Sequence, residues 1–127
     1  DGLADRVRML GWRKDLAQIY AATDVFLLTS RNEGTPVALI EAMAAATASV
    51  STNVGGVQDV INSDDVGLLA PFGDADALAA HLCALIDDPQ ERRQMGAAAR
   101  ARVASHYSLD RLTNDIALVY AQLVGDN

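Results

Sequence analysis

Short apolar runs alternate with longer segments of helical period along most of this chain. The clearest run is Val25–Leu28, a continuous apolar stretch of the kind that is buried on both faces of a sheet. Residues 7–10, 49–52 and 66–69 are weaker candidate strands. Because parallel strands need long crossover connections, the alternation predicts an α/β fold. We expect a Rossmann-like open parallel sheet of about four strands, with flanking helices and a helical C-terminal tail.

Residues that cap helices mark where most of the predicted helices begin. Thr35 is predicted to cap a helix whose first turn contains Pro36, and three later helices follow Asp74, Asp88 and Ser108. Apolar residues then recur at helical spacing. In the helix after Pro36 the predicted inner residues are Leu39, Ile40, Met43 and Ala44. In the last helix they are Leu109, Leu112, Ile116, Val119, Tyr120 and Leu123.

Length and charge restrict the functions that are open to the chain. It has 127 residues, which is the size of one domain (1–127), and 17 acidic against 10 basic side chains give a net charge of −7. Nucleic-acid binding needs a basic face, so we expect no nucleic-acid partner. The first nine residues are too charged for a signal peptide, and no apolar run has the length of a membrane helix. The expected location is the cytoplasm, and the single cysteine excludes an internal disulfide.

The stretch 33–44, EGTPVALIEAMA, lies where the best predicted strand is followed by a helix. In open parallel sheets, ligands bind at this edge, and the unpaired amides of a helix start attract anions. Gly34 lets a ligand oxygen approach the backbone. Glu41 lies beyond the helix start, and helical side chains lean back toward it, so its carboxylate can accept hydrogen bonds from a vicinal diol such as a ribose.

Each of the two glutamates also has a reading that needs no ligand. Glu33 complements the positive end of the helix dipole, which is the usual reason for an acid at that place. Glu41 is a good helix former on an exposed face. The residues alone therefore leave a ligand role and a structural role open for both.

Glu33 and Glu41, separated by seven residues, resemble the E-x7-E motif of the group 1 retaining glycosyltransferases, which have the GT-B fold. Further segments resemble that family in the same order along the chain. These segments are residues 22–30 (A-D-V-x-x-x-P-S), Gly55 with Gly56 (G-G-x-x-E), residues 67–74 (G-L-L-x-x-x-G-D) and Tyr107 with Ser108 (F-S-W). Together the matches cover nearly the whole chain.

The resemblance implies a role for each matching residue. Glu33 would be the catalytic residue and would contact the donor hexose, and Glu41 would hold the ribose hydroxyls of a nucleotide-sugar donor. The other implied donor-binding residues are Gly34, Thr35, Pro36, Val37 and Ala38, with the diphosphate on the amides near Val37 and Ala38. The implied nucleobase pocket consists of Gly11, Trp12 and Arg13. A packing role for Trp12 stays open as an alternative.

The implied reaction is transfer of a hexose to an acceptor hydroxyl with retention of configuration, with no metal and no cofactor. The family's diphosphate-neutralising Arg and Lys, and its N-terminal acceptor domain, lie upstream of the matched segments. We therefore expect a partial C-terminal domain that transfers no sugar by itself. The alternative is a non-catalytic binding or interaction module, because Ala46, Ala48 and Asp59 stand where the family has Gly, Pro and Glu.

A run of arginines in the C-terminal half is the remaining charged feature. It consists of Arg92, Arg93, Arg100 and Arg102. We interpret it as a solvated helix face, with peripheral contact to an anionic membrane as the alternative. The sequence does not indicate an oligomeric state.

Overall fold

The structure, a computed structural model, describes residues 2–125, so residue 1 and residues 126–127 of the predicted domain lie outside it. A short 3-10 turn at Ala4–Arg6 precedes three strands and six α-helices among the described residues. In chain order these are α1 (Leu16–Ala21), β1 (Val25–Leu28), α2 (Val37–Ala44), β2 (Ala48–Thr52), α3 (Val57–Val60), β3 (Leu68–Ala70), α4 (Ala75–Asp87), α5 (Pro89–His106) and α6 (Leu109–Gly125).

The three strands form one parallel sheet in the order β1-β2-β3. Val25 pairs with Ala48, and Val50 on the same central strand pairs with Leu68. Every residue of β2 is buried, as expected for a strand with a neighbour on both sides and helices on both faces. The predicted α/β class and parallel sheet are thus confirmed.

The prediction of a strand at residues 7–10 is wrong, and the described sheet has three strands rather than about four. This segment is extended but pairs with no strand among the described residues, and Met9 is 92% exposed. Residues 7–10 include the charged Arg8, and all four are exposed, so the segment has no buried face. A strand forms where its backbone finds a partner, which an apolar run does not by itself supply.

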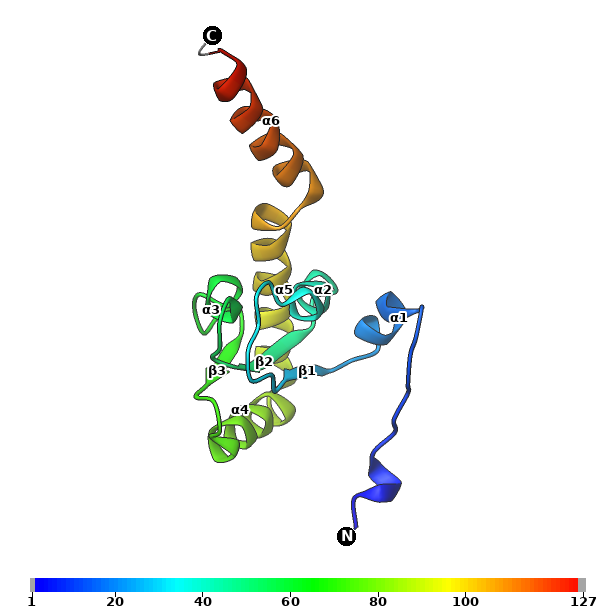
Figure 1. The fold of residues 1–127 in the computed structure, drawn as a ribbon. Helices are drawn as coiled ribbons and strands as arrows, with labels where there is room; N and C mark the ends of the chain where they lie inside the picture. Colours follow the sequence, from blue (N-terminus) through cyan, green and yellow to red (C-terminus); the bar gives the residue numbers. More distant parts are fainter. Residues whose placement is uncertain (1, 126–127) are drawn as a thin grey trace.

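Helices cover both faces of the sheet (Figure 1). On one face, Leu39 and Met43 of α2 pack with residues of α3 and with Ala99 and Val103 of α5. On the other face, Leu85 of α4 packs with residues of β2 and α5. The long helix α5 therefore contributes to both core clusters and joins the two layers.

Helix α2 begins one residue later than predicted. Pro36, and not Thr35, is the capping residue, and no side-chain hydrogen bond caps this helix. The inner stripe also differs, because Ala42 is fully buried with Leu39 and Met43, whereas Ala44 is exposed. The side of α2 that faces the sheet and α5 includes Ala42 and not Ala44. The spacing of apolar residues alone did not define which side is buried.

The predicted caps of the later helices are confirmed. The carboxylate of Asp74 accepts a hydrogen bond from the amide of Ala77 at 2.9 Å. Asp88 accepts from the amides of Gln90 and Glu91 at 2.8 and 2.9 Å, with Pro89 as the first helical residue. The hydroxyl of Ser108 accepts from the amide of Arg111 at 3.3 Å. These features depend on local chemistry, which is why the sequence reveals them.

The end of α2 is a Schellman motif. The amide of Ala46 donates to the carbonyl of Met43 at 2.9 Å, and the amide of Thr47 donates to Ala42 at 3.1 Å. Ala46 has a φ of 61°, in the left-handed region that the motif normally fills with glycine. It is the only non-glycine residue with positive φ among residues 2–125.

An Ala46→Gly variant should therefore be more stable than the parent chain. The left-handed conformation costs an L-residue about 1–2 kcal/mol, of which the flexibility of glycine in the unfolded chain offsets up to about 1 kcal/mol. We expect a net gain of roughly 0.5–1 kcal/mol in the free energy of unfolding, measured by chemical denaturation. Ala45→Gly is the control, because Ala45 has a φ of −78° and should lose stability. Equal effects at both positions would contradict this prediction.

Helix α6 extends away from the sheet, and its apolar face is exposed in the described chain (Figure 1). Its predicted apolar residues do lie at helical spacing, but they are between 47% and 73% exposed. None of the helices within residues 2–125 combines the length and the apolar character that crossing a bilayer requires.

Candidate functional site

The carboxyl ends of β1 and β2 carry two loops that are joined by hydrogen bonds. The hydroxyl of Thr52, at the end of β2, donates to the carbonyl of Ser30 at 2.7 Å. The amide of Gly56 donates to the carbonyl of Glu33 at 3.1 Å. The loop that precedes α2 is thus held in place by the loop that follows β2, at the sheet edge where parallel α/β folds bind ligands.

Gly55 and Gly56 are required by the close contact between these two loops. A Cβ on Gly55 would lie 1.9 Å from the carbonyl oxygen of Glu33, and a Cβ on Gly56 would lie 2.1 Å from that of Gly34. Gly55 also has a φ of 49°, which side chains disfavour. The glycine pair therefore lets one loop lie directly against the backbone of residues 33–34.

The carboxylate of Glu33 is oriented by its own loop. The hydroxyl of Ser30 donates to Oε1 of Glu33 at 2.5 Å, and both side chains are half-buried. This hydrogen bond engages one carboxylate oxygen. Sequence reasoning did not single out Ser30 for this role, although the spacing of three residues within a turn is one signal that could have suggested it.

The start of α2 presents amides that the described chain does not use. The amide of Val37 donates to the carbonyl of Thr35 at 2.9 Å, and the amide of Ile40 donates to Pro36 at 3.1 Å. No hydrogen bond within residues 2–125 uses the amides of Ala38 and Leu39, of which only Ala38 is exposed, whereas Leu39 is buried. Gly34, Thr35, Val37 and Ala38 are exposed, whereas Pro36 is buried. The arrangement suits an anion at this helix start.

Glu41 lies on the second turn of α2, exposed, and contacts α1. The phenol of Tyr20 donates to Oε2 of Glu41 at 3.1 Å. Both residues line a cleft of about 500 Å³ between α1, α2 and Arg100 of α5. Burial raises the pKa of Tyr20, and the hydrogen bond and negative charge of Glu41 raise it further. The phenol therefore stays protonated at neutral pH and acts as the donor.

Gly11, Trp12 and Arg13 lie on the exposed segment before α1. The indole of Trp12 is 82% exposed, with the Lys14 ammonium 5.3 Å from its ring centre, so the packing alternative for Trp12 is wrong within the described chain. The guanidinium of Arg13 binds the carboxylate of Asp15 at 2.8 and 2.5 Å and lowers the pKa of Asp15. No hydrogen bond or ion pair among residues 2–125 connects this segment to α2.

A comparison with protein families identifies the family of this chain. The family described as "Glycosyl transferases group 1" matches residues 1–102. The chain belongs to this family.

Relatives and solved structures agree with this assignment. An N-acetyl-alpha-D-glucosaminyl L-malate synthase from Bacillus anthracis is 31% identical over 125 residues, which are 98% of this chain and 33% of that protein. Sucrose-phosphate synthase from Thermosynechococcus elongatus superposes with a TM-score of 0.91 at 32% identity, over 98% of this chain and 32% of that one. The group 1 glycosyltransferase chain thus spans about a third of the length of such relatives.

Two further matching structures are of one protein, HepE from Anabaena. In complex with UDP it superposes with a TM-score of 0.91 at 27% identity, and in complex with UDP-glucose the TM-score is 0.89 at the same identity. Each match covers 95% of this chain and 34% of HepE. The fold of this chain therefore matches part of the Rossmann-like fold of GT-B glycosyltransferases.

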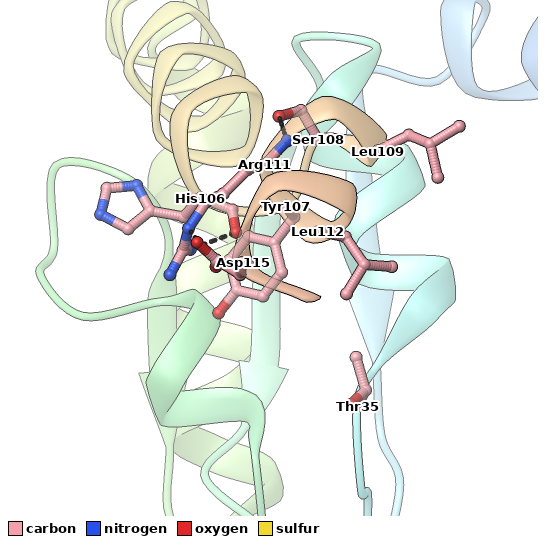
Figure 2. A pocket seen from close by; sticks show the side chains of 8 residues that line it. All are labelled: Thr35, His106, Tyr107, Ser108, Leu109, Arg111, Leu112 and Asp115. Atoms are coloured by element: carbon pink, nitrogen blue, oxygen red, sulfur yellow. Dashed lines mark hydrogen bonds and ion pairs between the residues drawn. The ribbon is translucent and has the colours of Figure 1, made fainter. Parts of the chain in front are cut away.

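A second hollow of this group 1 glycosyltransferase chain lies between Thr35 and the junction of α5 with α6 (Figure 2). It measures about 570 Å³. Arg111 lines it and donates to the carbonyl of His106 at 2.5 Å, with Asp115 at 3.4 Å from its Nε. Sequence reasoning missed Arg111, a cation on the same hollow as Thr35, because no spacing in the sequence relates α6 to the start of α2.

Proposed function

We propose that this chain binds the nucleotide-sugar donor of a retaining glycosyltransferase. In the reaction, the bond between the anomeric carbon and the donor diphosphate oxygen breaks, and the diphosphate leaves with the electron pair. The acceptor hydroxyl oxygen forms the new bond to that carbon, on the same face, and its proton passes to the departing diphosphate oxygen. The hexose is thereby transferred with retention of configuration.

The position of the loop before α2 is the observation that carries the proposal. The loop lies at the carboxyl edge of a parallel sheet and carries the partly buried Glu33. It leads into the start of α2, where the amide of Ala38 is not used by the described chain. HepE, which superposes on this chain, is solved with UDP and with UDP-glucose. The membership of the chain in the group 1 glycosyltransferases makes a non-catalytic module the less supported reading.

The proposal assigns parts of the donor to parts of the site. Glu33 contacts the hexose together with the backbone of Gly34 and Thr35. The diphosphate lies at the start of α2, where the helix dipole and the amide of Ala38 favour negative charge. The nucleobase lies toward the exposed Trp12, beside Gly11 and Arg13.

We propose that the rest of the activity lies in parts of the protein outside this chain. The chain spans about a third of its relatives, so we propose that an N-terminal domain carries the acceptor and the further cations that the diphosphate needs. The intact protein is then a cytoplasmic enzyme. The prediction of a solvated face is wrong for two of the four arginines of α5, because Arg92 donates to the carbonyls of Leu85 and Ile86 and Arg102 donates to that of Asp59. The exposed Arg93 and Arg100 remain as an optional contact to an anionic membrane surface.

A Glu41→Ala variant should bind UDP roughly tenfold more weakly than the unsubstituted chain. The substitution removes hydrogen bonds from ribose hydroxyls to a charged, solvent-exposed acceptor, which are worth about 1.5 kcal/mol. The measurement is calorimetry with UDP, extended to millimolar ligand.

Glu91→Ala is the matched control, because it removes the same charge from an exposed position of α5. The amide of Glu91 still donates to Asp88 after the substitution, so the helix start is kept. We expect wild-type affinity from this control. If the unsubstituted chain shows no binding at millimolar UDP, the donor site is not in this chain.

A further inference from the structure

The side chain of Tyr20 joins α1 to the glutamate of α2 that we place at the donor ribose. Its hydroxyl donates to Oε2 of Glu41 at 3.1 Å, across 21 positions of sequence. In the described chain no other side chain donates a hydrogen bond to this carboxylate. The contact lies on the cleft between α1 and α2, so a ligand in that cleft meets both groups.

Tyr20 is itself held by two further contacts. The hydroxyl of the buried Thr47 donates to the carbonyl oxygen of Tyr20 at 3.1 Å. The ring of Phe26, on β1, meets the tyrosine ring edge-on, with centroids 6.0 Å apart and an angle of 70° between the planes. The sheet and the segment after α2 therefore fix the phenol before any ligand arrives.

One hydrogen bond of this kind is suited to orient a carboxylate without blocking it. A carboxylate has two oxygens with several acceptor positions, so engagement of Oε2 leaves Oε1 for a ligand. Glu41 is exposed and its side chain would otherwise rotate among several rotamers, whose loss on binding costs affinity. The hydrogen bond from Tyr20 orders the Glu41 side chain already in the folded chain, so that this entropy is not lost again when a ligand binds.

We propose that Tyr20 is a positioning residue that holds the Glu41 carboxylate ready for the ribose hydroxyls of the nucleotide donor. This inference rests on the proposed function. Tyr20 does not contact the reacting atoms. It acts through Glu41, so its effect should exist only for ligands that have ribose hydroxyls.

If the hydrogen bond between Tyr20 and Glu41 only held α1 against α2, its removal would give a different result. Removal of the Tyr20 hydroxyl would lower the stability of the chain, and any loss of binding would be the same for every nucleotide. The ribose hydroxyls therefore separate the two roles, since 2′,3′-dideoxy-UDP keeps the base and the diphosphate but offers Glu41 no diol.

The experiment measures dissociation constants by NMR titration of the 127-residue chain with UDP and with 2′,3′-dideoxy-UDP. We expect Tyr20→Phe, which keeps the ring against Phe26, to weaken UDP binding about fivefold and to leave 2′,3′-dideoxy-UDP unchanged. In a Glu41→Ala background the same substitution should have no further effect. Tyr120→Phe, on the exposed face of α6, is the matched control and should bind both ligands as the unsubstituted chain does.

Two results would overturn the inference alone. In both, the unsubstituted chain binds UDP better than the dideoxy ligand. In the first, Tyr20→Phe binds UDP with the same affinity as the unsubstituted chain. In the second, Tyr20→Phe loses affinity for the two ligands by the same factor. Absence of UDP binding by the unsubstituted chain would instead overturn the proposed function, and the inference with it. The two failures are thus distinguishable in one titration series.

Discussion

A Gly56→Ala variant is expected to lose about 3 kcal/mol of the free energy of unfolding, together with its affinity for UDP. The new Cβ would lie 2.1 Å from the carbonyl oxygen of Gly34, which is backbone and cannot rotate away. The loop before α2 has to move, and with it the hydrogen bond from Gly56 to Glu33. In a chain of this size, such a loss lowers the melting temperature by about 10 °C.

Gly34→Ala separates the steric effect on the fold from the effect on the ligand. A Cβ on Gly34 meets no atom within 4 Å, so this variant should melt within about 2 °C of the parent chain. Its affinity for UDP should nevertheless be lower than that of the parent chain, because the methyl group occupies the space that the ligand approaches. Melting curves and UDP titrations of both variants give the test. Parental stability in Gly56→Ala would mean that the two loops do not touch as described.

The parts of the fold that depend on neighbouring residues could be predicted from the sequence. The caps at Asp74, Asp88 and Ser108 and the strand Val25–Leu28 fall into this class, and the structure confirms them. The left-handed residue after α2 also follows from local chemistry. Ala46 stands where the family resemblance calls for glycine, and its φ is positive.

Features that depend on a distant partner could not be predicted. Residues 7–10 look like a strand but have no partner strand in the described chain. The apolar stripe of α6 has the predicted phase, but helical spacing shows only that a face exists and not what covers it. The hydrogen bond from Tyr20 to Glu41 joins two helices, and no spacing within either helix indicates it.

The end of α2 links these local and distant features to the candidate site. The Schellman motif at Ala46 directs the chain so that Thr47 is buried beneath α1. There its hydroxyl holds the backbone of Tyr20, which in turn contacts Glu41. The orientation of one proposed ligand-binding carboxylate therefore depends on how the helix that carries it ends.

A Gly96→Ala variant should destabilise the chain by about 3 kcal/mol, although helix propensity alone predicts the opposite sign. Alanine is better than glycine inside a helix by about 1 kcal/mol. However, a Cβ on Gly96 would lie 2.0 Å from the carbonyl oxygen of Ala46 and 2.8 Å from its carbonyl carbon. To relieve this, α5 has to move away from α2, which also loosens the packing of Ala99 and Val103 against Leu39.

Ala97→Gly is the matched control, because Ala97 is the next residue of α5 and is exposed. There only propensity acts, so glycine should cost about 1 kcal/mol. The two substitutions exchange the same two residue types in opposite directions, and both should lower the midpoint of urea unfolding, Gly96→Ala by more. A chain in which Gly96→Ala raises the midpoint would show that α5 does not lie against the end of α2. The close approach of these two helices, on which the packing of Leu39 and Met43 against Ala99 and Val103 depends, would then be wrong.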